Sequence, residues 1–267
     1  MSFPPLWRSQ LNALYSNPES MTTSSKLTSM SSPVSEPLNI PTDIFYEILL
    51  QSDDQDTAFF WLDCRRVSHS FHSAVEHVFA VKYLNQTFIH AHYTRGEQTG
   101  TSYTKFEFSH IDPTDSSRVI YKHSKLDERY REDTCYCLNT VLEASISQLE
   151  WPKILIEVQH HLNDTMLPDL RYSFDPQSSL FEISFNWKGM FSHFFREERE
   201  VARKINIVNS LVQAEQGDKL KSSEMWVLFW SNKMTVRRAI REERIKRFMT
   251  ERKVMGSTDP GIDGDER

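Results

Sequence analysis

Hydrophobic and polar residues alternate with a period of two through the middle of the chain, from about residue 86 to residue 187. Such alternation is typical of β-strands, because successive side chains point to opposite faces of a sheet. Short turn sequences such as Asp112-Pro113-Thr114-Asp115 separate the runs and favour antiparallel neighbours. The alternation also predicts that one face of the sheet is exposed to solvent. About six strands are expected, over residues 87–93, 103–108, 119–121, 154–158, 170–174 and 180–185.

Apolar positions before this region follow a helical spacing instead, from about residue 38 to residue 84. Ile44, Ile48 and Leu49 mark one face of a first helix. Pro41 stands at its first position, where a missing N–H costs nothing. Ser52-Asp53-Asp54 ends this helix and supplies a cap for the next. The second helix is expected to continue through Phe59, Phe60, Leu62, Val67, Phe71, Val75 and Val78.

Two long helices are expected after the sheet, the first ended by Gly217-Asp218 and the second from about Ser223 to Val254. The first has an apolar stripe at Phe191, Phe194, Ala202, Ile205, Val208 and Val212. Expected inward positions of the second are Trp226, Phe229, Trp230, Met234, Ile240, Phe248 and Met249. Residues 126–150 are ambiguous, and their second half has helical spacing at Leu138, Val141, Leu142, Ile146 and Leu149.

Together these patterns predict an α+β protein. Residues 38–84 form a helical module. Residues 85–255 form an α+β domain with an antiparallel sheet at about 86–187 and a pair of long helices at about 188–254, which cover a face of the sheet or each other. A Ser/Thr/Pro-rich lead at 1–37 and an acidic tail at 256–267 bury too little to offset the entropy of ordering, so both are expected to be disordered.

Composition narrows the classes of function. The chain has 267 residues, of which 39% are hydrophobic, which is enough for a substantial core. It has only 7 glycines and no G-x-G pair, so the dinucleotide, P-loop and kinase phosphate loops are excluded. No membrane span and no secretory signal are expected. The 3 cysteines fit a reducing compartment, so we expect a cytoplasmic or nuclear protein.

Motifs of enzymes and metal sites are absent from the sequence: it contains no H-E-x-x-H, G-x-S-x-G or Cys-x-x-Cys. Cys135-Tyr136-Cys137 has a gap of one residue and no second pair, so zinc is not expected. His160 and His161 stand at a strand end, where their rings point to opposite faces and do not easily share a metal. We therefore expect no catalytic residue, no metal and no cofactor.

Charge is distributed unevenly along the chain. Residues 38–186 carry 12 Lys/Arg against 22 Asp/Glu, a net −10, whereas residues 187–256 carry 16 against 9, a net +7. The last helix is the most basic element and has two interpretations: a solvated outer face, or a surface for an acidic partner. The acidic body opposes nucleic-acid binding and could itself attract the helix. The arginines of the second interpretation are Arg237, Arg238, Arg241, Arg244 and Arg247.

The helical module resembles an F-box. That motif opens with Leu-Pro, an acidic residue and a branched aliphatic residue, and closes near a Cys-Arg run followed by an aromatic residue. Here the opening is Ile40-Pro41-Thr42-Asp43-Ile44 and the close is Leu62-Asp63-Cys64-Arg65-Arg66-Val67-Ser68, then Phe71. Ile replaces the usual Leu, and Asp the usual Glu. The runs Trp61 to Ser68 and Ala74 to Phe79, with Asn186 to Glu198, look like the F-box-like proteins of filamentous fungi.

This resemblance implies a non-catalytic substrate receptor of a cullin-based ubiquitin ligase. The module would bind the small adaptor subunit, and the rest of the chain would recruit an unknown protein substrate. The alternative is an interaction or scaffold protein with an F-box-like fold that joins no ligase; a third reading has the helices pack only on this chain's own sheet. The matched adaptor-binding positions are Ile40, Pro41, Ile44, Ile48, Leu49, Leu62 and Val67.

Overall fold

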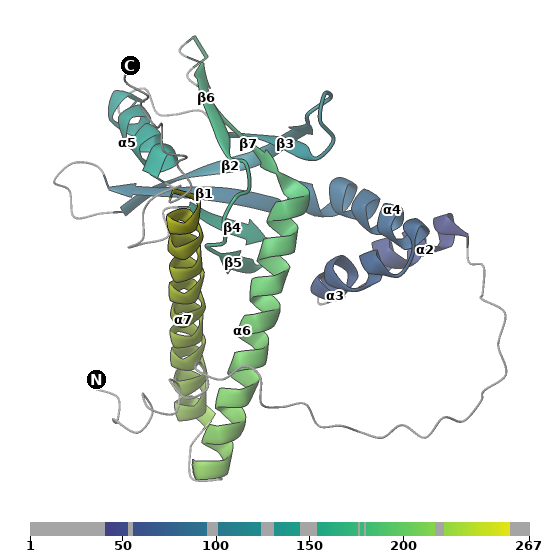
Figure 1. Ribbon diagram of the computed structural model, residues 1–267, viewed down its shortest axis with the longest axis vertical. Coiled ribbons are helices and arrows are strands. Elements are labelled where there is room, and N and C mark those ends of the chain that lie inside the picture. The colour runs from purple at the N-terminus through teal and green to yellow at the C-terminus, as the bar shows by residue number, and fades with distance from the viewer. Residues whose placement is uncertain are drawn as a thin grey trace, which may run out of the picture. The chain divides into compact units, whose positions relative to one another are not determined.

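The computed structural model describes residues 41–52, 56–94, 101–123, 131–144, 154–175, 177–178, 180–216 and 222–256 (Figure 1). The architecture of these residues is α+β, as the sequence predicts. Several predictions concern residues outside the described part: the lead at 1–37, Ile40, Asp53, Asp54, Ile146, Leu149, Gly217, Asp218 and the tail after Gly256.

Short helices form the N-terminal part of the described chain. The prediction of one continuous second helix is wrong, because the α-helix ends at Leu62 and a new one begins at His69. Ser68 adopts an extended backbone, and its Oγ accepts a hydrogen bond from the N–H of Phe71 at 3.2 Å, which starts a new helix there. Pro41 is the residue before its helix, not the first one in it. The helices are α2 (Thr42–Gln51), α3 (Thr57–Leu62), the 3₁₀ helix η2 (Cys64–Arg66) and α4 (His69–Val78).

A buried connection joins α4 to the sheet. The chain passes through a π-helical turn, η3 (Phe79–Tyr83), and a 3₁₀ turn, η4 (Leu84–Gln86), before the first strand begins. The side chains of Phe79, Tyr83 and Leu84 are buried, and the Oη of Tyr121 in the sheet donates a hydrogen bond to the carbonyl of Leu84 at 3.1 Å. The helices are thus joined to the sheet by packed, hydrogen-bonded structure.

Among the described residues the sheet is antiparallel throughout and has seven strands in the order β5-β4-β1-β2-β3-β7-β6. Six of them overlap the six predicted runs. The strands are β1 (Thr87–Thr94), β2 (Thr101–Ile111), β3 (Arg118–His123), β4 (Ile154–Val158), β5 (His161–Asn163), β6 (Arg171–Asp175) and β7 (Leu180–Asn186).

The short edge strand β5 is the one that the sequence pattern misses. Val158 pairs with His161, so Gln159 and His160 form a two-residue turn, in which Gln159 has a φ of 56°. Turns of this kind normally carry Gly or Asn, because other residues are strained at positive φ. The prediction that both histidines end one strand is therefore wrong: His160 lies in the turn and His161 begins β5.

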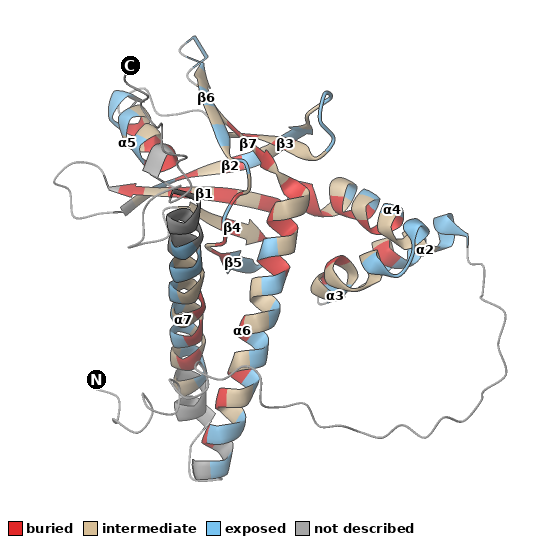
Figure 2. Ribbon diagram, in the orientation of Figure 1, coloured by how far each residue is buried: buried red, intermediate tan, exposed pale blue. Residues whose placement is uncertain are grey.

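One face of the sheet is buried and the other is partly exposed, as the alternation of apolar and polar residues in the sequence predicts. Ile89, Phe106, Tyr121 and Ile183 lie on the buried face of four strands. Helix α5 (Arg131–Ala144) packs against β1, where it adds Leu138, Val141 and Leu142 to the core. Figure 2 shows the buried residues concentrated along the central strands and along the first turns of the helix that follows β7.

Helices α6 (Trp187–Gln216) and α7 (Ser222–Gly256) run side by side in opposite directions (Figure 1). The first turns of α6 belong to the sheet core, and further along it Val201 is buried where Ala202 was expected. Among the α7 side chains that the structure describes, the buried ones are Asn232, Val236 and Ile240, spaced one turn apart. The predicted inward positions Phe229, Trp230 and Met234 are exposed. Trp230 and Met234 lie off the buried face, whereas Phe229 is in line with it. The side chains of Trp226, Phe248 and Met249 are outside the described part.

Candidate functional site

Helix α2 has one apolar face packed and another exposed. Phe45 packs against Phe71 of α4 with ring centroids 3.8 Å apart, and Leu49 is 4% exposed. Ile44 and Ile48 lie one turn apart, and they keep 50% and 52% of their surface exposed. Helix α2 thus has exposed apolar side chains in addition to the apolar face that packs on α4. Exposed apolar side chains of this kind are typical of a surface that binds a partner.

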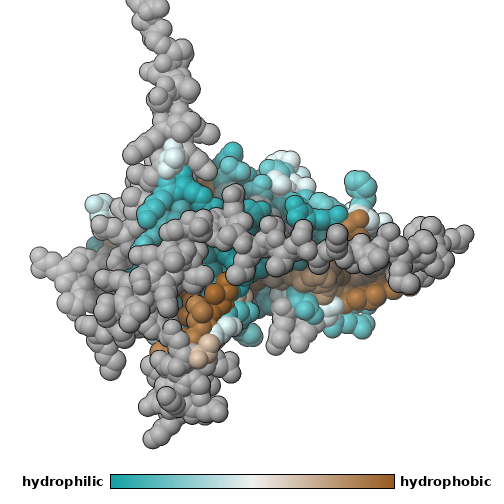
Figure 3. Space-filling model, turned by 60° about the horizontal axis from the view of Figure 1, so that its bottom comes forward, coloured by the Kyte–Doolittle hydropathy of each residue, from teal (hydrophilic) through white to brown (hydrophobic). Residues whose placement is uncertain are grey.

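Two more exposed apolar side chains lie on the elements that follow α2. Phe59 of α3 is exposed, and Val67, just after η2, is 68% exposed. Brown, apolar atoms lie among the teal, polar atoms at the right of Figure 3, where these helices lie. We call Pro41, Ile44 and Ile48 the apolar face of the module, since all three are exposed and their spacing places them on one side of α2. Val67 is a further exposed apolar residue of the module.

The structure describes six of the seven matched adaptor-binding positions and separates these six into three groups. Pro41, Ile44, Ile48 and Val67 are exposed, and Ile40 lies outside the described residues. The assignment of Leu49 to the adaptor-binding positions is corrected, because its side chain is buried in the core and has almost no surface left for a partner. Leu62 is half-buried and lines a pocket between α3 and α6. The helical spacing could not distinguish these cases, because both faces of α2 are apolar.

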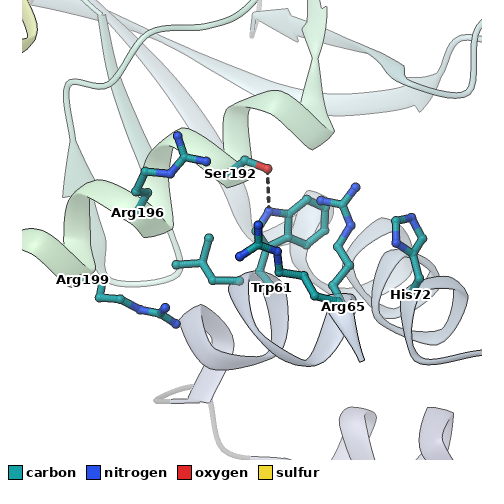
Figure 4. A pocket seen from close by; sticks show the side chains of 8 residues that line it. Trp61, Arg65, His72, Ser192, Arg196 and Arg199 are labelled. Carbon is teal, nitrogen blue, oxygen red and sulfur yellow. Dashed lines mark hydrogen bonds between the residues drawn. The ribbon is translucent and has the colours of Figure 1, made fainter. Parts of the chain in front are cut away.

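Trp61 fixes the module on α6. Its side chain is 2% exposed, and its Nε1 donates a hydrogen bond to the Oγ of Ser192 at 3.0 Å (Figure 4). The indole also lies 4.6 Å from the ring of Phe79 and 5.3 Å from that of Phe191, measured between centroids. Aromatic contacts of this kind add to the free energy of burial, so the module has a fixed position on the rest of the described chain.

Ion pairs around Glu76 of α4 strengthen this contact. The carboxylate accepts hydrogen bonds from Arg65 and Lys188, each at 2.6 Å, and His72 lies 2.9 Å away. Burial alone raises the pKa of the Glu76 carboxyl, but the hydrogen bond from Lys188 and the charges of Arg65, Lys188 and His72 outweigh it and lower the pKa. Lys188 belongs to α6, so the carboxylate links the two parts of the chain.

Arg199 of α6 forms a second link to the module through Asp63, with both carboxylate oxygens accepting from its guanidinium. The hydrogen bond from Arg199 holds the pKa of the Asp63 carboxyl below its usual range. Both groups are partly exposed, so this pair orients the module more than it stabilises the fold.

The arginines of α7 are divided between the interior and the surface. The Nη2 of Arg237 donates hydrogen bonds to both carboxylate oxygens of Glu198, at 2.8 and 2.9 Å. Arg241 and Arg244 both bind Asp164, at 3.0 and 3.2 Å, and Arg244 also donates to Glu197. The interpretation of these three arginines as a surface for an acidic partner is corrected: their acidic partners belong to this chain. Arg238 and Arg247 are exposed, and for them that interpretation stays a prediction.

Two further groups of chemically active side chains lie on the sheet. On its partly exposed face the Nε2 of His90 lies 2.7 Å from Glu157, and the ring of His92 stacks on Tyr103. On its buried face the Nδ1 of His123 accepts a hydrogen bond from the N–H of Phe181 at 2.7 Å. Burial lowers the pKa of the His123 imidazole, although the backbone carbonyl of Phe181, whose oxygen lies 3.2 Å from the same nitrogen, acts in the opposite direction. His123 is thus a neutral core residue.

Comparison of the chain with protein-family models, with curated proteins and with solved structures finds no match. Within the described ranges, no helix combines the length and the apolar character that a membrane crossing requires. The same residues contain no group of three or more His, Cys, Asp or Glu side chains placed to hold a metal ion. The candidate site therefore rests on the module itself: an apolar face, held in place by Trp61, Glu76 and Arg199.

Proposed function

We propose that this chain is a non-catalytic substrate receptor of a cullin-based ubiquitin ligase, which binds the small adaptor subunit through the apolar face of its helical module. The observation that carries the proposal is the exposure of Ile44 and Ile48 on successive turns of α2, at the positions that the F-box resemblance assigns to the adaptor. Val67, at the close of the same motif, is exposed as well.

Apolar docking is physically sufficient for this role. Burial of a branched aliphatic side chain is worth about 1.5–3 kcal/mol, so a few exposed anchors of this kind can dominate the energy of a small interface. Receptors of this class act by holding a substrate close to the ligase, which raises the effective concentration and needs no reacting side chain.

A fixed module supports the same role. A receptor transmits the position of its substrate only if its two ends do not move independently. The contacts of Trp61 with Ser192 and of Glu76 with Lys188 join the module to α6, which continues into the pair of long helices. In this proposal the sheet and the long helices recruit the substrate.

Co-expression of the full chain with the adaptor tests the proposal. The variant Ile44→Asp/Ile48→Asp places two charges on the apolar face, and we expect it to lose most of the adaptor that co-purifies with the wild type. The matched control is Leu211→Asp/Met234→Asp, which places two charges on exposed apolar positions of α6 and α7. Circular dichroism of both variants is the control that tests whether they are folded.

The outcomes divide the hypotheses. Loss of adaptor only in the first variant supports the proposal. A folded wild type that binds no adaptor contradicts it and leaves the interaction or scaffold protein as the better account. Equal loss in the two variants also contradicts it, because the control lies outside the module.

A further inference from the structure

Four arginines line one pocket between the helical module and α6. Arg65 and Arg66 come from η2, and Arg196 and Arg199 come from the third and fourth turns of α6 (Figure 4). The pocket has a volume of about 410 Å³. His72, Trp61, Leu62 and Ser192 complete its lining. Nothing in the sequence singles out these arginines as a group, because the two pairs are far apart along the chain.

Positive charge in this pocket exceeds the negative charge that accompanies it. None of its lining residues in the described structure is an Asp or a Glu. Arg65 is paired with Glu76 and Arg199 with Asp63. In the part of the chain that the structure describes, Arg66 and Arg196 form no ion pair, and both are accessible to solvent. The charge of Arg66 acts on Asp63, but the two side chains form no ion pair. Two guanidinium groups, one from η2 and one from α6, are therefore available to an anion.

Arg65 is held in place for such a role. Its guanidinium lies over the ring of Trp61, 4.4 Å from the centroid, and its paired nitrogen contacts Glu76 at 2.6 Å. Its Nε is buried and has no hydrogen-bond partner among the described residues. The contacts with Trp61 and Glu76 fix the guanidinium before any ligand binds, which reduces the entropy that binding would cost.

We propose that this pocket binds a small molecule that carries a phosphate or diphosphate group. Guanidinium groups are planar and always charged, and they match the oxygens of a phosphate with two parallel hydrogen bonds. The volume lies within the usual range of small-molecule sites, about 300–1,000 Å³. This inference does not rest on binding of the adaptor.

A bound phosphate would join the module to α6. Arg66 belongs to the module and Arg196 to α6, so a ligand bound by both acts as an additional link between them. A ligand that binds only the folded chain also raises its melting temperature. The proposal thus predicts both saturable binding and stabilisation of the full chain.

Isothermal titration of the full chain with inorganic pyrophosphate, at constant ionic strength, is the direct test. We expect saturable binding by the wild type and a loss of affinity of at least about tenfold in Arg66→Gln/Arg196→Gln. The matched control is Arg238→Gln/Arg247→Gln, which removes two exposed arginines from α7, and its affinity should equal that of the wild type. The variant Arg66→Lys/Arg196→Lys keeps both charges and should show an intermediate loss.

Several results would overturn the proposal. One is the absence of saturable pyrophosphate binding by the wild type, and another is an equal loss in the two Gln variants, which indicates attraction to the overall charge. A phosphoserine peptide that binds more tightly than pyrophosphate would overturn the assignment to a small molecule. If the Gln variant does not fold, the Lys variant decides: undiminished affinity there contradicts recognition by the planar guanidinium.

Discussion

The indole of Trp61 in α3 donates a hydrogen bond to the hydroxyl of Ser192 in α6 over 3.0 Å, across 131 positions of the chain. Around this bond lie the rings of Phe79, Trp187 and Phe191. The contact decides how the molecule works in the proposed role, because it places the apolar face of the module at a fixed position relative to the long helices.

Replacement of Trp61 by Ala should lower the free energy of unfolding by about 3–5 kcal/mol, the usual cost of removing a large buried aromatic side chain. Phe59→Ala is the matched control in the same helix, and because Phe59 is exposed its cost should stay below about 1 kcal/mol. Denaturant unfolding of the full-length chain measures both values. Similar costs in the two variants would show that Trp61 does not anchor the module.

Arg244 on α7 gives a second prediction. Its guanidinium is largely buried and binds Asp164 and Glu197, so Arg244→Met leaves Glu197 without its partner and Asp164 with Arg241 alone. We expect a loss of about 3 kcal/mol in the free energy of unfolding. Arg238→Met, at an exposed position of the same helix, should change it by less than about 0.5 kcal/mol. If both substitutions are neutral, α7 does not depend on these ion pairs.

His123 gives a prediction for the dependence of stability on pH. Its pKa is lowered by burial from the ordinary value of 6.5, so the unfolded chain takes up a proton at a higher pH than the folded chain. Stability is therefore full above pH 6.5 and falls as the pH decreases toward the lowered pKa, by at most about 1.4 kcal/mol per pH unit.

The variant His123→Asn isolates this effect, because its side-chain oxygen can accept the hydrogen bond from Phe181 but does not titrate. We expect a smaller loss of stability between pH 7.5 and 5.5 than in the wild type, measured by urea unfolding. The exposed His69→Asn is the control and should leave the slope unchanged. A wild-type slope retained in His123→Asn would mean that other groups cause it.

Much of the fold could be predicted from the sequence, because two-residue periodicity and helical spacing report directly on which face is buried. The six longer strands and both long helices were found in this way. β5 was not, since Gln159 and His160 are unusual residues for a tight turn. The break before α4 was also missed, because the capping action of Ser68 is a local hydrogen bond that leaves the apolar spacing unchanged.

The candidate site was harder to predict, and the reason lies in tertiary contacts. Leu49 and Ile48 are neighbours of the same character, yet one is buried and the other exposed, because only the position of α4 decides between them. The arginines of α7 present the same problem. Their sequence shows a basic helix, but the acidic residues that bind Arg237 and Arg244 lie on α6 and after β5, and only the fold brings them together.

Hydrogen exchange of the full chain with and without the adaptor tests the central claim most directly, since it reports where a partner binds. The account predicts slower exchange of the backbone amides of α2, residues 42–51, when the adaptor is present, and unchanged exchange in α7. Unchanged exchange in α2 at saturating adaptor, or protection confined to the sheet and the long helices, would contradict it.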